Sequence, residues 1–190
     1  MPVIESIPVA AVVEVQPMLA EKTVPVAVAD ASVGHREFVA DSSMLVHLYL
    51  HDGNSEAIER FLAADAKVVS LPALARIEVL NVLLRQESRA GQFLADLAEG
   101  VRLRLEPVDW PKAFQQAESL ARRFSLALRP DGHDLVLVTA AVAMGGRWFL
   151  SFDRHSRQRP LAAAAGLRVW PPLGKDEKGL VKHAAQQAAG

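Results

Sequence analysis

Apolar and polar positions divide residues 38–170 into short apolar runs and longer segments of helical periodicity. The apolar runs predict buried strands, and 101–108, which alternates apolar with charged residues, predicts a strand nearer a sheet edge. The other predicted strands are 38–40, 67–71, 147–152 and 167–170. Predicted helices lie between the strands, at 42–50, 55–65, 72–84, 91–100, 111–126, 134–144 and 161–165. This alternation predicts an α/β fold, a three-layer α/β/α sandwich around a central parallel sheet with right-handed crossovers.

The two ends of the chain differ from this middle part. Residues 1–37 contain Val- and Ala-rich segments that prolines interrupt at positions 2, 8, 17 and 25, and proline prevents long central strands. We expect a flexible arm outside the domain, with a short strand that pairs only in an oligomer as a further option. Residues 171–190 are polar and alanine-rich, which predicts a mobile tail. Residues 38–170 are expected to form one domain with one core.

The chain contains no cysteine, which excludes disulfides and thiolate metal sites and fits a reducing cytosol. The longest uncharged apolar run, Leu135–Gly146, is too short to span a bilayer. The N-terminus lacks a basic region followed by an unbroken apolar segment, so it does not resemble a signal peptide. We therefore expect a cytoplasmic protein with no membrane partner.

Four carboxylates stand at positions where side chains of α/β proteins often bind ligands or take part in catalysis. Asp41 and Asp153 each directly follow a predicted strand, and the ligands of parallel α/β sheets bind at the carboxyl ends of strands. Glu78 lies in the middle of an apolar helix, where an unpaired carboxylate is costly to bury. Asp134 begins another apolar helix three residues after Asp131, which is the spacing of an N-cap and its N3 acid. Asp131 is thus the predicted cap, and Asp134 is the better candidate for a ligand.

These residues also have purely structural explanations. Taken alone, Asp41 could simply cap the helix that follows it. Ser42 and Ser43, the next two residues, predict a serine at the N-cap of that helix. Glu78 fits an ion pair with Arg85, seven residues further on and near the same helix face. His133, beside Asp134, fits either a solvent-facing residue or a substrate contact.

Four acids that converge in one partly buried pocket repel one another and raise one another's pKa values. A divalent cation removes this repulsion, and ligation by oxygen alone suits Mg²⁺ or Mn²⁺. Such ions polarise a phosphodiester and generate hydroxide from bound water. Residues 38–170 contain 16 Lys and Arg against 15 Asp and Glu. Four acids committed to metal would therefore leave a basic surround, which suits a polyanionic substrate.

Four segments carry a resemblance to a known family, namely VADSSMLVHLYL, LARIEVLNVLLR, HDLVLVTAAVAMGG and FLSFD with the downstream GLRV. Over Phe38–Trp170 the chain resembles the PIN-domain ribonucleases, and among them the VapC-type toxins of toxin–antitoxin systems. The resemblance implies a PIN-like fold and an Mg²⁺- or Mn²⁺-dependent endoribonuclease that acts on RNA. It further implies a homodimer and a small antitoxin protein as partner.

The resemblance also assigns residues to roles. The metal-binding and catalytic quartet that it implies is Asp41, Glu78, Asp134 and Asp153. Ser43 matches a hydroxyl that helps to order the site, and Ser151 matches the hydroxyl often found two residues before the last acid. Asn81 matches a frequent polar neighbour of the second acid. The long N-terminal extension departs from the compact family.

Two other functions compete with this one. A haloacid-dehalogenase-like phosphatase also has an Asp after its first strand, but it needs a second Asp two residues later, where this chain has Ser43. A non-catalytic PIN-like nucleic-acid-binding module usually lacks one or more of the acids, and all four are present here. A Rossmann or P-loop nucleotide-binding domain fails because no glycine-rich loop follows the first strand.

Overall fold

The computed structural model describes residues 37–64, 67–86 and 89–188. The predicted arm lies outside this part of the chain except for Glu37. The Glu37 carbonyl accepts hydrogen bonds from the backbone N–H groups of Arg147 and Trp148, both at 2.9 Å. Glu37 therefore already belongs to the domain that follows it.

The described residues form a five-stranded sheet in the order β3-β2-β1-β4-β5, and every pair of neighbouring strands is parallel. The strands are β1 (Phe38–Ala40), β2 (Val69–Leu71), β3 (Leu103–Leu105), β4 (Trp148–Leu150) and β5 (Arg168–Trp170). All five occur where the sequence predicts them, and β3, the strand with alternating charges, lies at a sheet edge.

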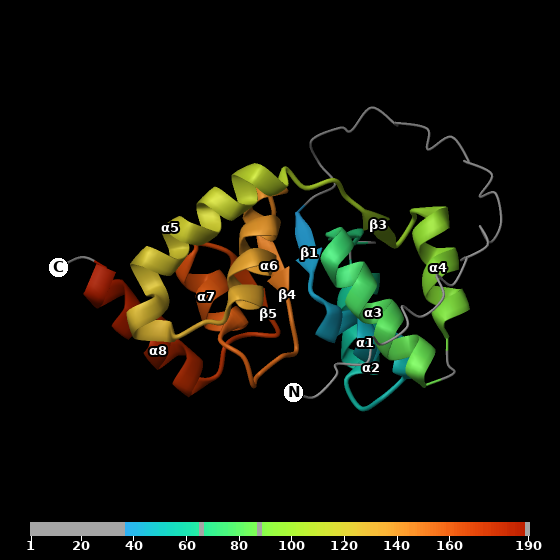
Figure 1. The fold of residues 1–190 in the computed structure, drawn as a ribbon. Coiled ribbons are helices and arrows are strands. Elements are labelled where there is room, and N and C mark those ends of the chain that lie inside the picture. Colours follow the sequence, from blue (N-terminus) through green and yellow to red (C-terminus); the bar gives the residue numbers. More distant parts are fainter. Residues whose placement is uncertain (1–36, 65–66, 87–88, 189–190) are drawn as a thin grey trace, which may run out of the picture. The chain divides into compact units, whose positions relative to one another are not determined.

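Helices cover both faces of the sheet, which confirms the predicted three-layer α/β/α sandwich (Figure 1). The first set is α1 (Ser42–Leu50), α2 (Ser55–Ala63), α3 (Ala73–Arg85) and α4 (Ala90–Glu99). The second set is α5 (Trp110–Leu128), α6 (Gly132–Ala143), α7 (Gln158–Ala164) and α8 (Lys175–Ala188). Each set encloses one hydrophobic core against the sheet.

Alternation along the central strands supplies both cores. Ala40 and Leu150 pack into the core under α1–α4, whereas Val39 and Phe149 pack into the core under α5–α8. Successive side chains of a strand point to opposite faces, so a strand buried on both sides must be apolar throughout. This explains why the central strands are continuous apolar runs in the sequence.

Helix α8 corrects the prediction of a mobile C-terminal tail. Residues 175–188 form a helix whose Ala184 is fully buried and whose Leu180 packs against the core under α5–α8. The Glu177 side chain accepts a 2.7 Å hydrogen bond from the Gly174 N–H and so caps the start of the helix. Few apolar side chains of α8 contact the core. The sequence of this segment therefore shows no apolar periodicity that would predict a helix.

Within the residues that the structure covers, no helix combines the length and the apolar character needed to cross a membrane.

Candidate functional site

The candidate site lies where the direction of the sheet connections reverses. β1 pairs with β2 on one side and with β4 on the other, and in open α/β sheets ligands bind at the carboxyl ends of the strands at such a point. The Asp41 N–H donates to the Leu150 carbonyl at 3.0 Å, which brings the ends of β1 and β4 together. Asp41 and the segment Ser151–Asp153, far apart in the sequence, therefore lie side by side.

Asp41 is the N-cap of α1, and its Oδ1 accepts from the Met44 N–H at 3.2 Å. This corrects the predicted serine cap and confirms the capping role considered for Asp41. The carboxylate does more than cap, because two hydroxyls also donate to it. Ser43 Oγ lies 2.7 Å from Oδ1, and Ser151 Oγ lies 2.7 Å from Oδ2.

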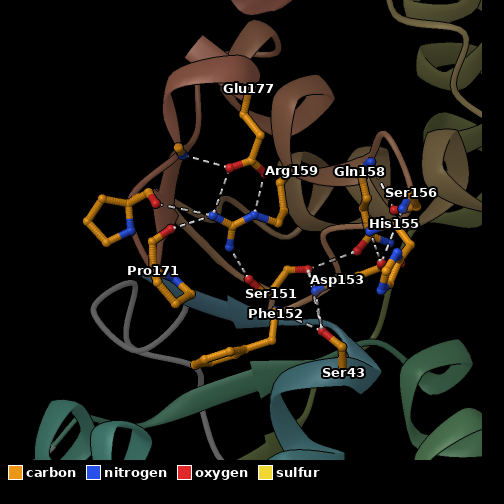
Figure 2. A network of polar contacts seen from close by, with 12 residues as sticks. Ser43, Ser151, Phe152, Asp153, His155, Ser156, Gln158, Arg159, Pro171 and Glu177 are labelled. Atoms are coloured by element: carbon orange, nitrogen blue, oxygen red, sulfur yellow. Dashed lines mark hydrogen bonds and ion pairs between the residues drawn. The ribbon is translucent and has the colours of Figure 1, made fainter. Parts of the chain in front are cut away.

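The same two hydroxyls hold the backbone at Asp153. The Asp153 N–H donates to Ser43 Oγ at 3.1 Å and to Ser151 Oγ at 3.2 Å, and the Phe152 N–H donates to Ser43 Oγ at 2.8 Å (Figure 2). Each hydroxyl thus donates to Asp41 and accepts from the residue that carries the second acid. The two serines fix Asp41 and Asp153 relative to each other.

The two acids differ in protonation behaviour. Burial raises the pKa of Asp41 to about 6, against the opposing effect of its hydrogen bonds from Ser151, Ser43 and Met44, and the nearby charge of Asp153 raises it further. Burial also tends to raise the pKa of Asp153, but hydrogen bonds from the N–H groups of His155 and Ser156 outweigh it and lower that pKa. In the metal-free site, burial therefore disfavours the charged form of Asp41, whereas hydrogen bonds stabilise the charged form of Asp153.

Asp134, in the first turn of α6, contacts the loop that follows β4 and carries Asp153. It forms the predicted capping box with Asp131, the N-cap of α6, and its Oδ2 also accepts from the Arg157 N–H at 3.2 Å. Burial raises the pKa of Asp134, and the Ser156 side chain interacts with the carboxyl groups of both Asp134 and Asp153, lowering each pKa. Asp134 is thus linked to Asp153 through the loop that follows β4.

Glu78, on α3, is paired with His133 and not with Arg85. Glu78 Oε1 lies 2.7 Å from His133 Nε2, and no ion pair joins Glu78 to Arg85 among the described residues. The other oxygen, Oε2, is buried and has no hydrogen-bond partner in the described part of the chain. A buried carboxylate oxygen without a donor is costly, so this atom is suited to a cation. His133 is therefore not simply solvent-facing, because it pairs with Glu78 and directly precedes Asp134.

In this conformation the four acids are not arranged to coordinate one metal ion together. Among residues 37–64, 67–86 and 89–188, no group of three or more His, Asp or Glu side chains is placed to hold a metal ion. The donors nevertheless fit a hard divalent cation, since the candidates offer carboxylate oxygens, one of which is buried without a partner. Ser43 and Ser151 join Asp41 to Asp153, whereas Glu78 is paired with His133, the residue next to Asp134.

The supporting residues from the sequence have different outcomes. Ser43 and Ser151 contact both Asp41 and Asp153, as described above. Asn81 is exposed on α3, and no hydrogen bond joins it to the other described candidates.

Sequence reasoning missed Arg159. Its guanidinium is buried and donates to the Ser151 carbonyl. The signal that would have found it is an arginine within α7, two residues before the small-residue apolar run 161–165.

The sequence matches the PIN domain family over residues 38–160. This range contains all four acids and both serines. It ends one residue after Arg159 and does not include α8. No curated protein matches the chain.

Proposed function

The chain belongs to the PIN domain family, and from this premise we propose that it is a metal-dependent endoribonuclease that hydrolyses RNA phosphodiester bonds. PIN domains are generally metal-dependent nuclease folds. The observation that carries the proposal is the pair Asp41 and Asp153, held together by Ser43 and Ser151 at the ends of β1 and β4. Family membership also counts against a haloacid-dehalogenase-like phosphatase.

We assign Asp41, Glu78, Asp134 and Asp153 to the metal-binding and catalytic quartet. A bound Mg²⁺ or Mn²⁺ supplies Lewis-acid polarisation of the phosphodiester and lowers the pKa of attacking water. Ser43 and Ser151 keep the oxygens of Asp41 oriented, and Glu78 offers its unpartnered Oε2. The high pKa of Asp41 favours this assignment, since a nearby cation stabilises the charged form that burial disfavours.

The loop after Asp153 is suited to the phosphate backbone of RNA. Arg154, His155 and Arg157 are exposed directly beside the acids. Cationic side chains at this position neutralise phosphates and position the strand. We therefore infer that RNA approaches the acids across this loop.

We further propose that the protein is the toxin of a toxin–antitoxin pair, that it forms a homodimer and that a small antitoxin binds it. The resemblance of four segments to VapC-type toxins supports this role. Ile77 and Leu84, which lie about two helical turns apart on one face of α3, are 63% and 64% exposed. Such exposed apolar side chains suit a protein partner. A short upstream reading frame that encodes a DNA-binding protein is the expected finding in the genome, and its absence would argue against the toxin role.

One observation favours the alternative of a non-catalytic nucleic-acid-binding module. Glu78 is engaged by His133, and Asp134 Oδ2 accepts from two backbone N–H groups. In such a module these contacts are the whole role of the acids. RNA binding without cleavage, unaffected by Mn²⁺, is then the expected result.

The test uses the purified full chain on a structured RNA with Mg²⁺, with Mn²⁺ and with EDTA. Cleavage that requires the metal, and that disappears in Asp41→Asn and Asp153→Asn, is the expected result. Glu118→Gln, an exposed acid on α5, is the matched control and is expected to cleave like wild type. Added Mn²⁺ is expected to raise the unfolding midpoint of wild type through linkage but not that of Asp41→Asn. Cleavage that survives EDTA would defeat the metal mechanism.

A further inference from the structure

Arg159 is 1% exposed, and its guanidinium joins three separate parts of the chain. Nη1 donates to the Ser151 carbonyl at the end of β4, and Nη2 donates to the Pro171 carbonyl, at 2.9 Å, just after β5. Nε donates to Glu177 Oε1 at 2.7 Å, on α8 (Figure 2). No hydrogen bond or ion pair joins Arg159 to the four described acids of the proposed quartet, so the proposed chemistry does not explain it.

Glu177 supplies the negative charge that allows Arg159 to be buried. Its second oxygen, Oε2, lies 3.4 Å from Arg159 Nη2 and also accepts from the Gly174 N–H at 2.7 Å. Partial burial tends to raise the pKa of Glu177, but the hydrogen bonds from Arg159 and Gly174 outweigh it and lower that pKa. A buried guanidinium without a carboxylate is strongly unfavourable, so the position of Arg159 depends on α8.

The chain of contacts ends at the proposed site. The backbone of Ser151 is held on both sides, by its N–H to the Trp170 carbonyl at 3.0 Å and by its carbonyl to Arg159. With the backbone fixed, the Ser151 hydroxyl donates to Asp41 Oδ2 and accepts from the Asp153 N–H. A shift of Arg159 therefore moves the hydroxyl that orients both acids.

We propose that Glu177 is a positioning residue for the nuclease site, acting through Arg159 and Ser151. The inference rests on the proposed function. Glu177 lies outside residues 38–160, the range that matches the family, so the family match assigns it no role. Partners that orient metal ligands from outside the first shell typically contribute about 10–100-fold in metal affinity or activity.

The experiment compares the full chain with Glu177→Ala, Glu177→Gln and the matched control Asp176→Ala, which removes the same charge from the neighbouring exposed position of α8. Mn²⁺ affinity is measured by titration in the absence of RNA, and kcat and KM are measured on RNA well below the unfolding midpoint. We expect Glu177→Ala to bind Mn²⁺ about 10-fold more weakly and to have a lower kcat with an unchanged KM. Asp176→Ala is expected to match wild type.

A merely structural role gives a different result. Glu177→Ala would then unfold at a lower temperature but keep the wild-type Mn²⁺ affinity and kcat below its midpoint, which overturns the inference. If Glu177→Ala does not fold, Glu177→Gln decides in the same way, because it keeps the shape and one oxygen acceptor. A wild-type chain that neither binds Mn²⁺ nor cleaves RNA overturns the proposed function and the inference together. An active wild type whose Glu177 variants equal Asp176→Ala overturns the inference alone.

Discussion

Glu78 Oε1 lies 2.7 Å from His133 Nε2, so α3 and α6 are joined by a side-chain pair directly beside Asp134. The two helices contribute to different cores, apart from Leu137 of α6, which belongs to the core under α1–α4. The pair therefore ties Glu78 to the side of the site that Asp134 occupies, while Glu78 Oε2 stays without a partner among the described residues.

Glu78→Gln tests whether this carboxylate binds metal or only pairs with His133. The amide keeps the shape but loses the charge. If Glu78 is a ligand, RNA cleavage falls by more than the roughly 10–100-fold typical of an outer-shell partner, and the metal-free protein is as stable as wild type or more so. Arg85→Ala is the control and should leave cleavage intact. An active Glu78→Gln enzyme would remove Glu78 from the site.

The stability of the metal-free protein should depend on pH through Asp41. Its pKa is raised from 3.8 to about 6 in the folded state, so the folded protein binds the proton more tightly than the unfolded chain. Stability from this residue is fully present below pH 4 and is lost as pH rises toward 6 and beyond. At about 1.4 kcal/mol per pKa unit, the loss is on the order of 3 kcal/mol.

Denaturant unfolding in EDTA between pH 4.5 and 7.5 checks this expectation. Asp41→Asn has no carboxyl proton to lose. The free energy of unfolding of this variant, relative to wild type, should therefore rise with pH and level off above about pH 7. Asp153 has a lowered pKa, so its effect has the opposite sign and falls below this pH range. A difference between the two proteins that does not change with pH would contradict the buried environment of Asp41.

Gly146→Ala should destabilise the domain. A Cβ at this position would lie 2.8 Å from Val39 Cγ2 and 2.9 Å from the Ala141 carbonyl oxygen, and such overpacking costs roughly 1–3 kcal/mol. Gly91→Ala is the matched control, because Gly91 lies in helix α4 and a Cβ added there would meet no atom within 4 Å apart from its chain neighbours and the backbone of its own helix. Thermal unfolding of the two variants should shift in opposite directions, since alanine favours a helix over glycine.

Tyr49→Phe separates stability from activity. The Tyr49 hydroxyl donates to Asp96 Oδ2 at 2.6 Å in a buried setting, and removing the donor costs about 1–3 kcal/mol. The ring keeps its edge-to-face contact with Phe93. We expect a lower free energy of unfolding with unchanged cleavage well below the midpoint. Lost cleavage at full stability would connect this pair to the site.

Deleting residues 1–36 should leave the domain folded, because the proline-interrupted pattern offers no sustained apolar face. The deletion keeps Glu37, whose carbonyl bonds to the start of β4. Unfolding and oligomeric mass are the measurements. A change from dimer to monomer with the fold intact supports pairing through the arm, whereas loss of the fold would contradict the predicted boundary.

The sequence predicts the five strands and α1–α7 because each has a continuous apolar run or a periodic apolar face. Helix α8 lacks this signal, since Leu180 and Ala184 provide most of its contact with the core and its capping contact comes from Glu177. Composition alone therefore assigns the segment to a mobile tail.

Candidate acids are likewise visible in the sequence by their places after strands and within apolar helices. Their partners are not visible, because contacts such as Glu78 with His133 and Ser151 with Asp41 join residues that are distant in the chain. Arg159 could be noticed as a charge beside an apolar run, but its three contacts depend on where β4 and β5 end and where α8 begins.

The adjacency of β1 and β4 also determines when the site can exist. About a hundred residues separate Asp41 from Ser151, and at roughly 5–20 residues per second the ribosome delivers β4 on the order of ten seconds after β1. A nascent chain that ends before Ser151 carries Asp41 and Glu78 but has neither the second serine nor Asp153. Whatever chemistry the site performs therefore begins only after nearly the whole domain has left the ribosome.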